Sequence, residues 1–261
     1  MVVTARPAAF DGQAAGTSES AWSAANLPER AAPLELDRVR RLLVVSAHPD
    51  DETLGAAGLI ARLHARGVPV DVLVASDGEA SHPHSPTTSA AAIGRRRRAE
   101  MVSATAHLAP RAAIRWLGRP DGRLADDEAG MAASIGPFLD GDPAGTLVVA
   151  PWRADAHPDH EAVGRAVARA NDGFGATVVE FPVWAWLWAT PDDPRLRPDR
   201  VRVLRLDERE WDSKQRAIAE HRSQIAPLGD DPEDRPVLTP AFLDHFRRRY
   251  ETFLPTGGAV A

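Results

Sequence analysis

The chain has 261 residues, a length that suits one α/β domain with a single sizeable core. Its formal net charge of −6 argues against a general nucleic-acid binder, which needs a basic surface to neutralise phosphates. Because the sequence contains no cysteine, disulfides and thiolate ligands are excluded, and any metal must be held by His, Asp and Glu.

Residues 1–37 are rich in Ala, Ser, Pro and Gly without clear periodicity, which predicts an extended or disordered segment. A single domain over residues 38–261 is expected to follow. No stretch approaches the roughly 18 apolar residues of a membrane helix. The start also lacks the apolar core of a secretory signal, so we expect a cytoplasmic protein with no membrane span.

The domain begins with a strand, a helix and a second strand. The apolar run 42–47 predicts a buried strand that ends at His48. Residues 53–66 carry apolar side chains at helical spacing and stop before Gly67, a common signal for a helix end. Residues 70–75 predict the next strand, so the three elements form a parallel crossover unit.

The alternation of strands and helices continues to about residue 223. Further helices are predicted over 93–108, after residue 160 and over 208–223, and further strands over 113–117, 146–150, 177–181 and 201–206. This order is typical of an α/β fold with a mainly parallel sheet. Such sheets bind ligands at the carboxyl ends of their strands, and two polar clusters follow strand ends here.

The two clusters, His48 to Glu52 and His157 to His160, contain the donors of a zinc site. Catalytic zinc takes three protein ligands and keeps one position open for water. His48, Asp51 and His160 can supply that set. Asp50 then faces the open side as a candidate general base that takes a proton from the water.

His157 and His160 are three residues apart, and both can face one side of a helix that starts at Pro158. A protonated His157 can stabilise an oxyanion or donate a proton to a departing amine, with Asp159 tuning its imidazole. Each cluster alone also fits a capped helix start. A capping role needs only one Asp and no histidine, so two such clusters after two apolar strands favour a site.

These residues resemble the PIG-L or LmbE-like N-acetylglucosaminyl deacetylase family. Its motifs appear here unbroken as Ala47-His48-Pro49-Asp50-Asp51-Glu52 and His157-Pro158-Asp159-His160. Weaker matches follow in the family's order: Asp77-Gly78-Glu79, Arg97-Arg98-Ala99-Glu100, Asp121-Gly122, and Lys214 through His221-Arg222-Ser223-Gln224. Some relatives have a tyrosine two residues before the second motif, where this chain has Asp155.

The resemblance implies a Rossmann-like three-layer α/β sandwich and removal of an N-acetyl or other N-acyl group from an amino sugar or glycoconjugate. It implies Zn²⁺, or another divalent metal such as Fe²⁺, on His48, Asp51 and His160, with Asp50 as the base. It also makes Arg97 and Asp121 candidate substrate contacts. The expected partner is a small molecule, with no nucleic acid, and a homo-oligomer is possible.

Three tryptophans at alternate positions, Trp184, Trp186 and Trp188, would share one face of a strand and serve either the core or a substrate cleft. Two other functions remain open. A nucleotide-dependent Rossmann-type enzyme, such as a methyltransferase or oxidoreductase, suits the element order, but the glycine fingerprint is missing after the first strand. A non-catalytic, metal-dependent sugar-binding module would keep the ligands without requiring Asp50.

Overall fold

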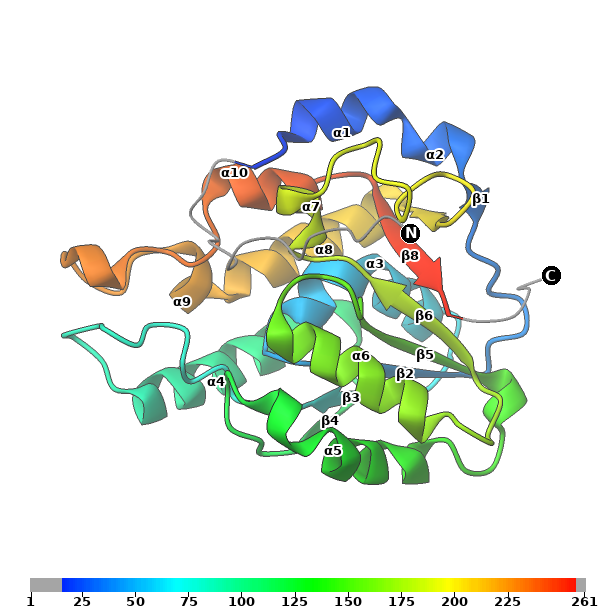
Figure 1. Cartoon of the computed structure of the whole chain (residues 1–261), viewed down its shortest axis with the longest axis horizontal. Helices are drawn as coiled ribbons and strands as arrows, with labels where there is room; N and C mark the ends of the chain where they lie inside the picture. Colours follow the sequence, from blue (N-terminus) through cyan, green and yellow to red (C-terminus); the bar gives the residue numbers. More distant parts are fainter. Residues whose placement is uncertain (1–15, 257–261) are drawn as a thin grey trace, which may run out of the picture.

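Eight strands form one mixed sheet in the computed structural model, which describes residues 16–256 (Figure 1). The strands are β1 (Ala32–Pro33), β2 (Arg41–Ser46), β3 (Val70–Val74), β4 (Ala113–Trp116), β5 (Thr146–Pro151), β6 (Thr177–Phe181), β7 (Arg202–Arg205) and β8 (Tyr250–Pro255). Their order across the sheet is β1-β7-β8-β6-β5-β2-β3-β4. Every pairing is parallel except those of β8, which runs antiparallel to β6 and β7.

Helices cover both faces of this sheet (Figure 1). They are α1 (Glu19–Ala25), α2 (Leu27–Arg30), α3 (Asp51–Ala65), α4 (Ala90–Leu108), α5 (Glu128–Ile135), α6 (Pro158–Ala170), α7 (Ala185–Trp188), α8 (Glu208–Glu220), α9 (Arg222–Ile225) and α10 (Pro240–Leu243). Leu42 and Val44 of β2 join one hydrophobic cluster with α3, α4 and α8. Leu43 and Val45 join a second cluster with α5 and α6. Because successive strand residues point to opposite faces, the apolar run fills two cores, and the expected three-layer sandwich is confirmed.

The central position of β2 brings the two polar clusters together. β2 pairs in parallel with β5, and Val44 lies beside Val149 in the register. The loops after both strands therefore leave from the same edge of the sheet, and they lead into α3 and α6. Two segments about 100 residues apart in the sequence thus meet at one place.

The N-terminal segment differs from the extended or disordered chain that its composition predicts. Residues 19–25 and 27–30 are helical, Ser18 caps α1 by accepting from the Ala21 N–H, and Trp22 is fully buried. One buried tryptophan anchors a helix whose other residues are small and polar, so no apolar period shows in the sequence. Residues 1–15 lie outside the described part of the chain, and the domain limits of 38–261 stay a prediction.

Two further differences lie in the C-terminal half. The helix expected over 208–223 ends at Glu220, where His221 caps it and α9 starts a new turn. The sequence does not predict strand β8, which lies near the end of the chain and pairs with β6 and β7. Within residues 16–256, no helix is long and apolar enough to cross a membrane.

Candidate functional site

The loop after β2 is a tight turn that holds the Asp51 carboxylate in place. Asp51 Oδ2 accepts hydrogen bonds from the backbone N–H groups of Ala47 (3.0 Å) and His48 (2.9 Å). Asp50 has a φ of 133°, which is rare for a residue with a side chain. The turn therefore places Asp50 and Asp51, neighbours in sequence, in different surroundings.

The second cluster begins α6, as its sequence predicts. His157 is the N-cap, its Nδ1 accepts from the Asp159 N–H at 3.3 Å, and Pro158 occupies the first turn. His160 in the same turn points at the first cluster, with Nε2 3.2 Å from Asp51 Oδ1. His48 Nδ1 lies 3.6 Å from Asp51 Oδ2. Ligand atoms of His48, Asp51 and His160 all lie within 4.8 Å of one another.

This donor set fits a divalent metal. His160 Nε2 is buried and has no hydrogen-bond partner among the described residues, although a carboxylate oxygen lies beside it. Two tetrahedral ligands at about 2.0 Å from zinc are separated by roughly 3.3 Å, close to the spacing seen here. An unpaired imidazole nitrogen facing a carboxylate at this distance is the arrangement that a metal ion completes.

Each candidate histidine ligand is oriented by outer carboxylates. The Nδ1 of His160 lies 2.8 Å from Asp155 Oδ2, and the Nε2 of His48 lies 3.0 Å from Asp121 Oδ1 and 3.2 Å from Asp159 Oδ2. Such partners fix the ring orientation and make the other nitrogen a better ligand. His48, Asp121 and Asp159 also lie close enough to form a ligand group of their own. In that group, however, Asp159 already accepts two backbone hydrogen bonds.

One of these outer carboxylates, Asp159, departs from the sequence interpretation, and another, Asp155, has no role in it. Asp159, which the sequence predicts to tune His157, contacts His48 and accepts from the Gly122 and Leu124 N–H groups. The helix start turns it toward the neighbouring loop. Asp155, which stands where some relatives have a tyrosine, is fully buried and holds His160. The sequence indicates this role of Asp155 only by placing a carboxylate two residues before His157.

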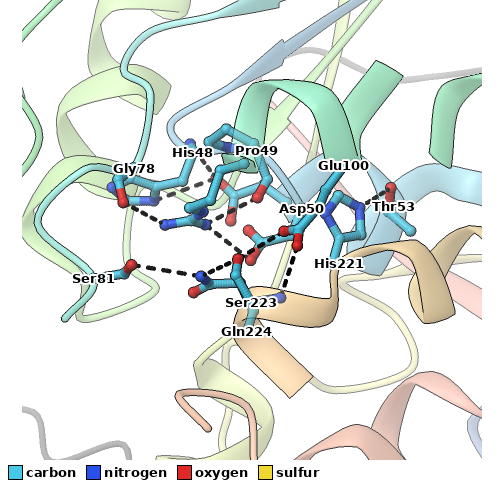
Figure 2. A network of polar contacts seen from close by, with 12 residues as sticks. His48, Pro49, Asp50, Thr53, Gly78, Ser81, Glu100, His221, Ser223 and Gln224 are labelled. Atoms are coloured by element: carbon cyan, nitrogen blue, oxygen red, sulfur yellow. Dashed lines mark hydrogen bonds and ion pairs between the residues drawn. The ribbon is translucent and has the colours of Figure 1, made fainter. Parts of the chain in front are cut away.

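Arg97, expected to reach substrate, lines a cavity beside the site and also binds the turn that carries Asp50. The guanidinium is 5% exposed and donates to the Gly78 carbonyl (2.9 Å), the Pro49 carbonyl (2.9 Å) and Asp50 Oδ2 (3.0 Å). Figure 2 labels these three acceptors. Asp121, the other expected substrate contact, accepts from the Ala80 N–H as well as contacting His48.

Burial and neighbouring charges shift the two candidate catalytic groups. Burial raises the pKa of Asp50 to about 6, against the opposing charge of Arg97. Burial and the positive charges of His160 and His48 hold the pKa of His157 well below its usual range. This shift favours a neutral His157 ring, because a third cation is not stabilised beside two others, whereas the sequence predicts a protonated His157. Its Nδ1 accepts a hydrogen bond, so the neutral ring carries its proton on Nε2.

A cavity of about 210 Å³ opens beside these groups. Its polar side includes Asp50, Asp121 and His157, and its apolar side includes Val183 and Leu238. The other lining residues are His48, Asp51, Leu54, Ala80, Ser81, Arg97, Gly122, His160, Trp184, Gln224 and Val237. The cavity combines charged and apolar lining residues, as small-molecule sites do.

Helix α9 contributes Gln224 to the cavity lining and is hydrogen-bonded to α4. Glu100 of α4 accepts from the Ser223 N–H at 2.9 Å and from its hydroxyl at 2.6 Å (Figure 2). The next residue, Gln224, donates to the Ser223 hydroxyl at 2.9 Å and lines the cavity. His221, which has an Nε2 to Thr53 Oγ1 distance of 3.0 Å, joins the same helix to α3. His221 therefore connects two helices and does not line the cavity.

The three tryptophans do not share a face, because residues 185–188 form the short helix α7 instead of a strand. Trp184 lines the cavity and stacks near His157, with ring centroids 6.3 Å apart and planes 15° apart. Trp186 is buried against Trp22, and Trp188 stacks on Trp152. The same segment therefore contributes Trp184 to the cavity and Trp186 to the core.

Comparison with known proteins identifies this arrangement. Residues 43–171 match the family model described as PIG-L, GlcNAc-PI de-N-acetylase, and this range contains both clusters. This part of the chain belongs to the PIG-L family. Helix α1 and strand β8 lie outside the PIG-L match.

Curated relatives match this chain at moderate identity. A 1D-myo-inositol 2-acetamido-2-deoxy-alpha-D-glucopyranoside deacetylase of Rhodococcus opacus (strain B4) is 34% identical over 174 residues, covering 64% of this chain and 51% of that protein. A probable N-acetyl-alpha-D-glucosaminyl L-malate deacetylase 2 of Bacillus subtilis (strain 168) is 32% identical over 132 residues, or 49% of this chain and 59% of that protein. The chain therefore spans about half the length of the curated relatives it matches.

Solved PIG-L structures share the fold. The antimicrobial reagent A40926 pseudoaglycone deacetylase Dbv21 superposes with a TM-score of 0.62 at 24% identity, covering 84% of this chain and 97% of that chain. The zinc-inhibited form of teicoplanin deacetylase Orf2 gives a TM-score of 0.60 at 22% identity, with 82% and 97% covered. At these identities the likeness establishes the fold.

Proposed function

We propose that this protein is a metal-dependent amide hydrolase that removes an N-acetyl group from an amino sugar or its glycoside. The observation that carries the proposal is the convergence of His48, Asp51 and His160 at the edge of a cavity that Asp50 and His157 also line. Neither a nucleotide-dependent enzyme nor a sugar-binding module requires that combination. The match of residues 43–171 to the PIG-L family and the deacetylase names of the relatives support the same reaction.

His48, Asp51 and His160 would hold the metal, and the two-nitrogen, one-oxygen donor set suits Zn²⁺ as well as Fe²⁺. Zinc is our proposal. When bound, such an ion lowers the pKa of a water molecule and stabilises negative charge on a carbonyl oxygen. The protein's part is to fix the ligands, and Asp155, Asp121 and Asp159 do so by orienting the two imidazoles.

Asp50 is the proposed base. Its carboxylate lines the cavity but is kept from the ligand group by the positive-φ turn and by Arg97. It takes the proton from the attacking water as the new carbon–oxygen bond forms. The resulting carboxylic acid returns that proton to the leaving nitrogen as the carbon–nitrogen bond breaks, so that water and amide give acetic acid and the amine, which ionise to acetate and an ammonium group at neutral pH.

His157 is the proposed hydrogen-bond donor to the substrate oxygen. Because its Nδ1 accepts a hydrogen bond, the neutral ring carries its proton on Nε2, and Nε2–H is the donor that we assign to this role. A neutral donor in a buried site stabilises a developing oxyanion without needing a second positive charge. Trp184 beside it contributes apolar lining to the same cavity.

Metal analysis combined with an amine-release assay tests the proposal. We expect the purified chain to carry about one divalent ion and to release amine from N-acetylglucosamine glycosides. His160→Ala should lose the metal, whereas Asp50→Asn should keep the metal and lose turnover. His84→Ala, which changes an exposed histidine, is the matched control and should change neither.

Each alternative function gives a distinct result in the same assays. A sugar-binding module would bind metal and sugar without releasing amine, and Asp50→Asn would leave that binding unchanged. A nucleotide-dependent enzyme would bind a nucleotide without metal or amine release. Equal metal loss in His160→Ala and Asp50→Asn would contradict the division of roles between ligand and base.

A further inference from the structure

Helix α1 lies against α7, the short helix that carries the tryptophans (Figure 1). Trp22 Nε1 donates to the Trp186 carbonyl at 2.8 Å, and the Thr17 N–H donates to the Leu187 carbonyl at 2.8 Å. The Thr17 hydroxyl donates to the Ala189 carbonyl at 2.6 Å. Residues 17–22, which we call the N-terminal brace, thus bind the carbonyls at the C-terminal end of α7.

The other end of α7 is held by the site itself. Asp155, which orients His160, also accepts from the N–H groups of Val183 (3.0 Å), Trp184 (3.0 Å) and Ala185 (2.9 Å). Helix α7 has only four residues and makes few internal hydrogen bonds. Its position is therefore set from outside, by Asp155 at one end and the brace at the other.

The brace reaches Trp184 by a second route as well. Glu19 Oε2 lies 2.8 Å from His245 Nδ1, and Glu19 pairs with the buried Arg248 guanidinium, which lies 4.2 Å from the Trp186 ring centroid. His245 packs edge-on against Phe242, with centroids 6.2 Å apart. Phe242 in turn stacks on Trp184, with centroids 4.5 Å and planes 18° apart.

We propose that the N-terminal brace positions Trp184 and thereby sets the affinity of the site for the acyl-sugar substrate. The brace supports the backbone that carries Trp184 and the Phe242 ring behind it, while the opposite side of Trp184 lies beside His157. Thr17, Glu19 and Trp22 are then positioning residues far from the reacting atoms. The effect on affinity depends on the proposed hydrolase function, whereas the effect on Trp184 does not.

Amide hydrogen exchange, which needs no substrate, tests whether the N-terminal brace holds residues 183–189 in place. Trp22→Phe keeps an aromatic ring in the buried site but removes the Nε1 donor to α7. Loss of one such hydrogen bond should speed amide exchange of residues 183–189 by roughly 2- to 10-fold. Trp211→Phe is the matched control, because Trp211 Nε1 also donates to a backbone carbonyl, that of Arg247, which is not part of α7. Unchanged exchange in Trp22→Phe, or equal acceleration in both variants, would overturn the proposal.

Steady-state kinetics tests the functional part. Trp22→Phe and Glu19→Gln should raise KM for an N-acetylglucosamine glycoside by roughly 3-fold or more, with kcat and metal content changed little. Glu29→Gln removes an exposed Glu–Arg pair on α2 and should leave KM unchanged. A fall in kcat with unchanged KM would refute the affinity role. If the wild-type protein released no amine, the proposed hydrolase function would fail, and the exchange experiment would still decide whether the brace holds Trp184.

Discussion

The Arg97 guanidinium lies 3.0 Å from the Asp50 carboxylate, and the two side chains are only 5% and 8% exposed. Arg97 also binds the carbonyl of Pro49, so it holds both the carboxylate and the backbone of the positive-φ turn. Asp50 is the proposed base, and its direction into the cavity depends on that turn. We therefore expect Arg97 to act through Asp50, and the direct substrate contact suggested by the sequence stays a prediction, since Arg97 also lines the cavity.

Arg97→Gln is expected to lower kcat by roughly 10- to 100-fold. The substitution removes charge-assisted hydrogen bonds worth about 1.5–3 kcal/mol and frees Asp50 from its fixed direction. Metal content should stay the same, because the three hydrogen bonds of Arg97 go to none of the candidate ligands. Arg98→Gln is the control, since Arg98 pairs with Asp77 at 2.7 Å but is 40% exposed. Equal kcat losses in the two variants would count against a special role for Arg97.

Gly78→Ala offers an independent way to displace Arg97. A Cβ at Gly78 would lie 2.1 Å from Arg97 Nη1, so the guanidinium would have to move away from Asp50. Gly78 also has a φ of +66°, which costs an alanine about 1 kcal/mol. Gly118 has a φ of +64°, and a Cβ added there would meet no atom within 4 Å, so Gly118→Ala isolates the backbone cost. We expect Gly118→Ala to show the backbone cost alone and Gly78→Ala to lose more stability, because it also disturbs the buried Arg97 contacts, with kcat reduced at least 10-fold only in Gly78→Ala.

The sequence predicts the central strands and the ligand group because both rest on local patterns. The apolar runs before His48 and His157 mark buried strands, and parallel strands of one sheet end at the same edge. The roles assigned to Asp159 and Arg97 depend on side-chain direction. A helix start and a positive-φ turn set those directions, and neither can be read from residue spacing.

Long-range packing accounts for the other differences. Helix α1 is stabilised by Trp22 and by pairs with Arg248 and His245, which lie more than 220 residues away. Asp155 is held beside His160 by the backbone N–H groups of residues 183–185, which fold back onto it. Contacts of this kind leave no periodic trace in the sequence.

Asp155→Asn should weaken metal binding by roughly 10- to 100-fold, the usual cost of losing a partner of a histidine ligand. One Asp155 oxygen serves His160 and the Trp184 N–H, while the other serves Val183 and Ala185, so an amide in either orientation leaves two donors without an acceptor. Competition with a chelator measures the change. Asp142→Asn alters a carboxylate that also caps a turn but pairs with Arg40 at the surface, and it should leave metal affinity unchanged.

The pair formed by Glu19 and Arg248 should make stability depend on pH in the acid range. Burial alone would raise the pKa of Glu19, but hydrogen bonds from His245 and Arg248 and the charge of Arg248 lower it to about 2, from 4.5 in the unfolded chain. A carboxylate with a lowered folded pKa contributes its full stabilisation above pH 4.5 and loses it as the pH falls toward 2.

We therefore expect Glu19→Gln to reduce the free energy of unfolding by about 1–3 kcal/mol at pH 7 and by progressively less between pH 4.5 and 2. Urea unfolding of the wild-type and variant proteins at several pH values measures the difference, in which the other carboxylates cancel. Glu29→Gln should show a small difference at every pH, because Glu29 is 62% exposed and its pair with Arg205 is screened by solvent. A Glu19→Gln difference that stayed constant down to pH 2 would mean that the packing of α1 against α7, and not the charge of Glu19, stabilises the brace.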